Sequence, residues 1–101
     1  MSQHLYRTTL PDGTGVTVTA GWDFPLGWYY LNIEGAVEDA RTDEDGFFYS
    51  NLTDPNAPHD DWTYFMLRLA EHGIRIPSEM AAAIRQDGAR RTRNAETDWS
   101  T

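Results

Sequence analysis

The chain has 101 residues, the usual size of one domain, and its formal net charge is −8. It contains no cysteine, which excludes disulfides, thiolate metal sites and a cysteine nucleophile. The negative charge argues against nonspecific binding to nucleic acid or to an anionic membrane, because both need a positive surface. The sequence also shows no signal-peptide pattern and no apolar run of about 20 residues to cross a bilayer, so we expect a cytoplasmic protein.

The first half of the chain has the pattern of four short strands. Residues 4–10 and 16–20 flank the turn signal Pro11-Asp12-Gly13, which predicts a β-hairpin. Residues 28–34 follow as a strand that is partly apolar on both faces, which is typical of a central strand. Residues 47–50 predict a short fourth strand after an acidic turn.

Two helices are predicted in the second half. Residues 61–72 carry an apolar stripe at the spacing i, i+3, i+4 and i+7, and Asp60 before them is suited to cap the helix. Gly73 ends this helix, and a second helix begins at Pro77 and ends at Gly88. The stripe consists of Trp62, Phe65, Met66 and Leu69.

These elements predict one α+β domain over residues 1–88. Its architecture is a four-stranded antiparallel meander sheet followed by an αα-hairpin packed on one face. Residues 89–101 are polar, contain arginine and lack a periodic pattern, so we expect a flexible tail there.

The acidic residues are concentrated in one part of the chain. Nine acids lie between positions 34 and 61 with Arg41 as the only base, so this segment alone carries a charge of −8. We interpret it as a surface for a partner protein that is itself basic, with Trp28 and Tyr30 as aromatic anchors. The predicted partner-binding residues are Glu38, Asp39, Asp43, Glu44, Asp45, Trp28 and Tyr30.

Metal-binding motifs are incomplete in this sequence. The run Asp43-Glu44-Asp45-Gly46 matches part of an EF-hand calcium loop, but Arg41 and Leu52 occupy the positions of its first and last ligands. The run His59-Asp60-Asp61 lies at a predicted helix start, where neighbouring side chains diverge and helix capping accounts for the aspartates. We therefore predict no metal and no cofactor.

Catalytic and nucleic-acid-binding motifs are also incomplete. No serine lies in a nucleophile elbow and no histidine spacing indicates a triad, so we predict no catalytic residue and no enzymatic activity. Residues 67–86 could form a helix-turn-helix, but the acidic body of the domain would repel the DNA backbone. We predict no direct contact with nucleic acid or membrane.

Four stretches resemble small uncharacterised proteins of proteobacteria and their mobile elements. They are Gly21-Trp22-Asp23-Phe24-Pro25-Leu26, the predicted strand 28–34 that follows it, Tyr49-Ser50-Asn51-Leu52, and Gly73-Ile74 with Pro77, and the likeness covers about residues 16–88. Size, acidity and the lack of cysteine are also similar to those of phage-encoded inhibitors such as anti-CRISPR proteins. That resemblance implies an inhibitor that blocks a basic, nucleic-acid-binding surface of a partner protein, and it assigns no functional residue.

Two other functions remain open from the sequence. The loop from Trp22 to Leu26 combines bulky side chains with turn residues and would suit a small-ligand pocket. An exposed sheet face with Trp28, Tyr30 and Phe48 would instead suit a homodimer with a regulatory role.

Overall fold

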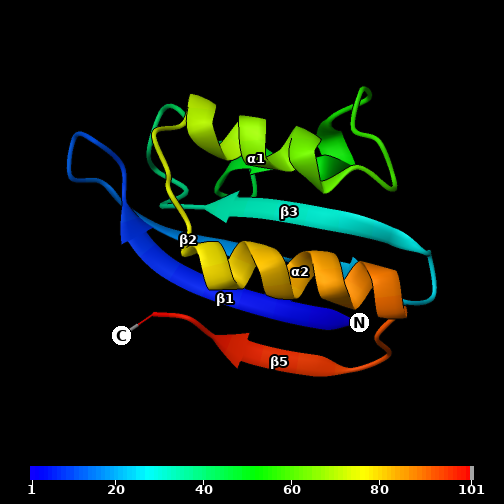
Figure 1. Cartoon of the computed structure of the whole chain (residues 1–101). Helices are drawn as coiled ribbons and strands as arrows, with labels where there is room; N and C mark the ends of the chain where they lie inside the picture. Colours follow the sequence, from blue (N-terminus) through cyan, green and yellow to red (C-terminus); the bar gives the residue numbers. More distant parts are fainter. Residues whose placement is uncertain (101) are drawn as a thin grey trace.

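The computed structural model describes residues 1–100 and has the predicted α+β class (Figure 1). One sheet has the strand order β4-β3-β2-β1-β5, in which all neighbours are antiparallel except β5, which runs parallel to β1. Two helices, α1 and α2, pack on one face of this sheet. The strands are β1 (Ser2–Thr9), β2 (Gly15–Asp23), β3 (Trp28–Glu34), β4 (Phe47–Ser50) and β5 (Ala95–Asp98); a short 3-10 helix, η1 (Asn51–Thr53), precedes α1 (Trp62–Glu71) and α2 (Ser78–Arg90).

The antiparallel meander from β1 to β4 confirms the sequence prediction. Its first turn forms as the residue types indicate: Gly13 takes a φ of +90°, and Asp12 accepts a hydrogen bond from the Thr14 amide at 3.0 Å. Alternation then directs every second residue of β2 and β3 toward the helices, including Val18, Leu31 and Ile33, which are fully buried. The core is therefore a single layer between the sheet and the two helices.

The helices follow the predicted stripe and turn. Phe65 and Leu69 of α1 lie in the core, but the N-cap is Asp61 rather than Asp60, because the Asp61 carboxylate accepts the Thr63 amide at 3.0 Å. Gly73 ends α1 with a φ of +72°, and a Cβ at this position would lie 2.5 Å from Pro11. Both the backbone conformation and the close contact therefore require glycine there. In residues 1–100, neither helix is long and apolar enough to cross a membrane.

The end of the chain differs from the sequence prediction. Helix α2 continues past Gly88 to Arg90, and Ala95–Asp98 forms the fifth strand where the sequence predicts a flexible tail and a four-stranded sheet. This strand pairs with the edge of β1, so its order comes from backbone hydrogen bonds and from Trp99 rather than from local pattern. A strand of four largely polar residues carries no alternation by which it could be recognised.

A buried histidine joins this C-terminal strand to the rest of the fold. His4 is 3% exposed, and its Nε2 lies 2.6 Å from the Asp87 carboxylate in α2. The Trp99 indole Nε1–H donates to His4 Nδ1 at 2.9 Å. An indole nitrogen can only donate, so Nδ1 is the acceptor and Nε2 carries the proton donated to Asp87. The contact thus links β1, α2 and the residue after β5.

We predict that Trp99→Phe lowers the free energy of unfolding by about 1 kcal/mol, because it leaves the buried His4 Nδ1 without its donor. For a domain of this size, that corresponds to a melting temperature lower by about 4–8 °C. Trp99→Ala should cost more, since it also removes the ring that stacks on His4. Calorimetry tests this, and a Trp99→Phe variant that melts like the wild-type protein would show that the strand is not held through His4.

A carboxylate anchors the loop between β4 and α1. The hydroxyls of Tyr49 and Tyr64 both donate to Asp54 Oδ2 at 2.7 Å. The hydrogen bond from Tyr49, and then that from Tyr64, lower the pKa of Asp54 below its usual value. The guanidinium of Arg68 lies over the Tyr64 ring. Asp54 therefore connects the fourth strand, the loop and the first helix.

We predict that the contribution of Asp54 to stability is lost in acid. Because its pKa is lower in the folded state, the contribution is present above the unfolded pKa of 3.8 and disappears as pH falls through the folded pKa. The difference in unfolding free energy between wild type and Asp54→Asn should therefore shrink as the pH falls below the unfolded pKa and through the lower folded pKa. Urea denaturation at several pH values measures it, and a constant difference would contradict the role of the charge.

Candidate functional site

The acidic loop (residues 35–46), which connects β3 to β4, is an ordered structure. The amide of Gly35 donates to the carbonyl of Gly46 at 2.7 Å, which closes the loop at its base. The Thr42 hydroxyl donates to the Asp39 carbonyl at 2.7 Å within the loop. Asp43 Oδ1 accepts from the amides of Asp45 and Phe47, both at 2.9 Å. Asp43 is therefore a structural residue of the turn as well as a charge.

Arg41 fastens the acidic loop to the turn between β1 and β2. Its guanidinium contacts Asp39 Oδ2 and Asp12 Oδ2, each at 2.8 Å, and it lies 5.2 Å from the centre of the Phe48 ring. The hydrogen bonds from Arg41 lower the pKa of Asp39 to about 2. One of the predicted partner-binding carboxylates, Asp39, is thus ionised and already paired with an arginine of the same chain.

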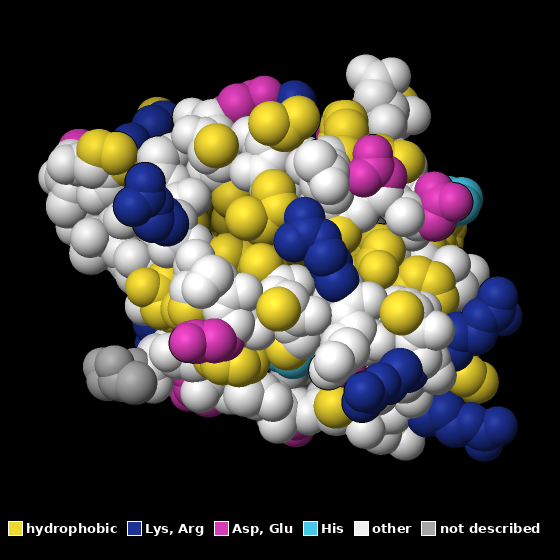
Figure 2. Space-filling model, viewed as in Figure 1, with side chains coloured by type: hydrophobic (Ala, Val, Ile, Leu, Met, Phe, Trp, Pro, Cys, Tyr) yellow, Lys and Arg dark blue, Asp and Glu magenta, His cyan; other side chains and the backbone are white. Residues whose placement is uncertain are grey.

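Three acids of the loop remain available to a partner. Glu38, Glu44 and Asp45 are exposed, and within residues 1–100 their side chains make no ion pair and no hydrogen bond. On the helix-covered face, by contrast, Figure 2 shows arginine and acidic side chains interspersed. Within the described residues, the loop therefore presents three carboxylates that form no ion pair.

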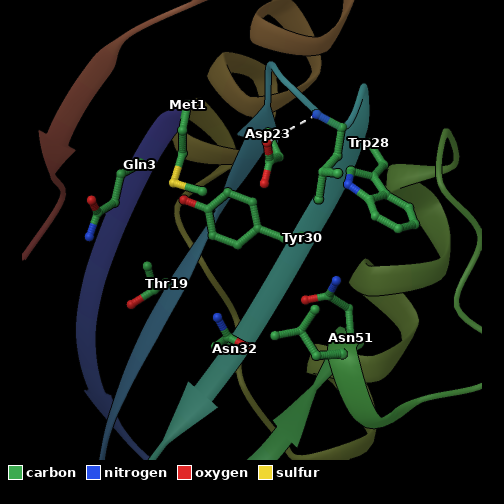
Figure 3. A pocket seen from close by; sticks show the side chains of 10 residues that line it. Met1, Gln3, Thr19, Asp23, Trp28, Tyr30, Asn32 and Asn51 are labelled. Atoms are coloured by element: carbon green, nitrogen blue, oxygen red, sulfur yellow. Dashed lines mark hydrogen bonds between the residues drawn. The ribbon is translucent and has the colours of Figure 1, made fainter.

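A second feature is a pocket on the sheet face that the helices leave open. Trp28, Tyr30 and Asn32 point to this face from alternate positions of β3, and side chains from β1 and β2 complete its floor (Figure 3). The pocket has a volume of about 270 Å³. We call it the sheet-face pocket; its lining residues are Met1, Gln3, Thr19, Asp23, Leu26, Trp28, Tyr30, Asn32, Asn51 and Leu52.

Tyr30 crosses the neighbouring strand to reach β1. It is paired with Gly21 in the sheet, and its hydroxyl donates to the Ser2 carbonyl at 2.8 Å. A Cβ at position 21 would lie 2.2 Å from that same carbonyl oxygen, so only glycine allows this approach. Burial, and to a lesser extent the charge of Asp23, raise the pKa of Tyr30 to about 12. The ring is thus fixed and its hydroxyl is protonated at neutral pH.

Asp23 places a carboxylate at one end of the pocket. Its Oδ1 accepts from the Leu26 amide at 3.3 Å, which shapes the turn between β2 and β3. Among the residues that the structure describes, no arginine or histidine forms an ion pair with it. Figure 3 shows the carboxylate next to the Tyr30 ring. On the other side of the pocket, Trp28 packs against the ring of His59.

The structure separates the predicted partner-binding residues into two groups. Trp28 and Tyr30 lie near the beginning of β3, whereas the acidic loop with Glu38, Glu44 and Asp45 follows its last residue, Glu34. At the rise of an extended strand, Glu34 is about 20 Å from Trp28 and about 13 Å from Tyr30. The predicted aromatic anchors and acidic residues therefore do not form one continuous patch.

The residues named in the ligand-pocket and homodimer hypotheses are also separated in the structure. Asp23 and Leu26 of the loop 22–26 do line a pocket, but Trp22 is buried on the helix side against Tyr29. Phe48 lies beside Arg41 in a separate hollow rather than with Trp28 and Tyr30. Of the polar lining residues, Asp23 is expected only as part of the loop 22–26, and Asn32 and Asn51 are not among the predicted site residues. The alternation along β3 could have indicated Asn32, but Asn51 reaches the pocket only through the fold.

Comparisons of the chain with models of protein families, with curated proteins and with solved structures find no match. Residues 1–100 also contain no group of three histidine or acidic side chains placed to hold a metal ion. The acidic loop and the sheet-face pocket are the features of the described chain that bear on its function.

Proposed function

We propose that the protein is a non-enzymatic binding module whose acidic loop docks on a basic surface of a partner protein. The observation that carries the proposal is the set of three exposed, unpaired acids on a loop that Arg41 and Asp43 hold in place. A pre-ordered loop loses little conformational freedom on binding, and unpaired charge increases the rate of encounter with a surface of opposite sign.

The sharpest form of this proposal is an inhibitor that covers a nucleic-acid-binding surface. Such surfaces are rich in arginine and lysine because they neutralise phosphates, and a protein with a net charge of −8 is complementary to them. The resemblance to anti-CRISPR proteins supports the same interpretation. The partner would then be a cytoplasmic nucleic-acid-binding protein, held directly and without nucleic acid or membrane in between.

The sheet-face pocket favours a second candidate, a small-ligand-binding domain. The pocket combines aromatic walls with polar groups that converge from β1, β2, β3 and η1, as ligand sites commonly do. A ligand held there should be insensitive to charge changes in the acidic loop, because the two features lie at opposite ends of β3.

The test is capture of the partner from cells of the source organism with paired baits. Glu44→Arg with Asp45→Arg reverses two loop charges without removing a hydrogen bond, whereas Asp43 is left intact because it closes the turn. The control is Glu79→Arg with Glu96→Arg, an equal charge change outside the acidic segment. We expect mass spectrometry to find a basic protein retained by the wild type and the control and lost by the loop variant. Equal retention by all three baits would contradict the proposal.

A further inference from the structure

We propose that the sheet-face pocket receives an arginine side chain of the partner protein, with the guanidinium between Asp23 and the rings of Tyr30 and Trp28. This inference rests on the proposed function, since it takes the occupant to belong to a basic protein. It assigns to the pocket a chemistry and a role that the acidic loop does not have.

The charge of the pocket favours a cation. Asp23 is half-buried and faces the pocket with no ion pair inside the described chain. Only one of its oxygens is used, by the Leu26 amide at 3.3 Å. The raised pKa of Tyr30, to which the charge of Asp23 contributes, agrees with this carboxylate lying close to the ring. A guanidinium would supply the missing counter-charge through hydrogen bonds assisted by charge.

The aromatic rings favour a planar cation. Trp28 and Tyr30 lie two residues apart on the same face of β3, and Asp23 is opposite Trp28 in the sheet. Cations bind over the faces of such rings, and arginine does so more often than lysine. Both rings are held in advance, Tyr30 by the Ser2 carbonyl and Trp28 by His59. The pocket is therefore shaped before any partner arrives.

The amides at the other end favour a residue within a polypeptide. The Leu31 amide donates to Asn51 Oδ1 at 3.2 Å, so the oxygen of that amide is occupied and its NH₂ group remains to donate. The amide oxygen of Asn32 is occupied in the same way, because the Ser50 hydroxyl donates to its Oδ1 at 2.7 Å. Within residues 1–100 neither NH₂ group has an acceptor, and Figure 3 shows both side chains beside the ring of Tyr30. A main-chain carbonyl next to the arginine would satisfy them.

The size of the pocket and the shape of the cation further limit which side chain can occupy it. The volume of about 270 Å³ has room for one long side chain. Lysine offers a compact ammonium that cannot form two parallel bonds with a carboxylate or stack on a ring, whereas the planar fork of arginine does both. The pocket thus fits an arginine better than a lysine.

The experiment is an NMR titration of the full chain with N-acetyl-arginine methylamide as the probe. Saturable shifts should centre on the Trp28 indole and on the amides of residues 30–32, with a dissociation constant of about 10 mM or below. N-acetyl-citrulline methylamide has the same shape without the charge and should not bind. Asp23→Asn keeps the acceptor for Leu26 and should weaken binding about tenfold. Glu79→Gln removes one charge from the first turn of α2, on the other face of the sheet, and should leave binding unchanged.

Each outcome of the titration either supports or overturns the assignment of an arginine to the pocket. Equal binding of the citrulline probe, or no weakening by Asp23→Asn, would overturn the arginine assignment, as would shifts centred on the acidic loop. Free arginine that binds much more tightly than the blocked probe would show a small-molecule site instead. The proposed function fails separately: capture of the partner would then be indifferent to the loop reversal, even if the pocket binds the arginine probe as expected.

Discussion

Phe65→Ala should lower the free energy of unfolding by about 3–5 kcal/mol, the cost of removing a large ring from a packed core. Phe65 has no exposed surface, and its ring packs against three aromatic rings, those of Tyr49, Trp62 and Tyr64. The cavity would open between α1 and the sheet, among the side chains of the buried core. Urea denaturation followed by tryptophan fluorescence gives the difference directly.

Leu67→Ala in the same helix is the matched control. Leu67 is 56% exposed and lies off the buried stripe, so its replacement should change the unfolding free energy by no more than about 0.5 kcal/mol. If Phe65→Ala were as mild as this control, α1 could not be the helix that closes the core. If both variants were severely destabilised, the helix would be packed on two sides instead of one.

The double reversal Glu44→Arg with Asp45→Arg should slow association with the captured basic partner by about tenfold or more at low salt. Long-range attraction between unlike charges raises association rates by about 10- to 1,000-fold, and this variant shifts the charge of the loop by four. Its melting temperature should stay near that of the wild type, because neither side chain is bonded in the fold. Surface plasmon resonance separates the two rates, and the dissociation rate should change less.

The control for that comparison is the reversal Glu79→Arg with Glu96→Arg, which changes the net charge equally from other surfaces. It tests whether the position of the charge matters or only its sum. A control variant that slows association as much as the loop variant would indicate a general electrostatic attraction, and the loop would lose its special role.

The parts of the fold that sequence predicts are those with local patterns. Alternation in β2 and β3 and the stripe of α1 are each set by burial of one face, so the residue order alone identifies them. Strand β5 has no such pattern, because it is fixed by the edge of β1 and by the bond from Trp99 to His4, residues 95 positions apart. Strand β5 therefore forms only when the rest of the chain is folded.

The candidate site shows the same limit. Sequence places Trp28 and Tyr30 on one face of a strand, opposite Leu31 and Ile33, and so makes them candidate contact residues. They are separated from the acidic loop because β3 runs from these two residues toward the loop. A count of charges along the sequence does not reveal this separation. Asp43 illustrates another limit: its charge is visible in the sequence, but its two hydrogen bonds within the turn appear only in the structure.

The most direct test of the central claim is a salt series of the association rate with the captured partner. The Debye length falls from ~30 Å at 0.01 M salt to ~8 Å at 0.15 M, so attraction by the acidic loop should weaken strongly over this range. We expect the wild-type rate to fall steeply with salt, and the rate of the Glu44→Arg, Asp45→Arg variant to be slow with little or opposite dependence. Rates that match for the two proteins at every salt concentration would contradict the claim that the acidic loop guides binding.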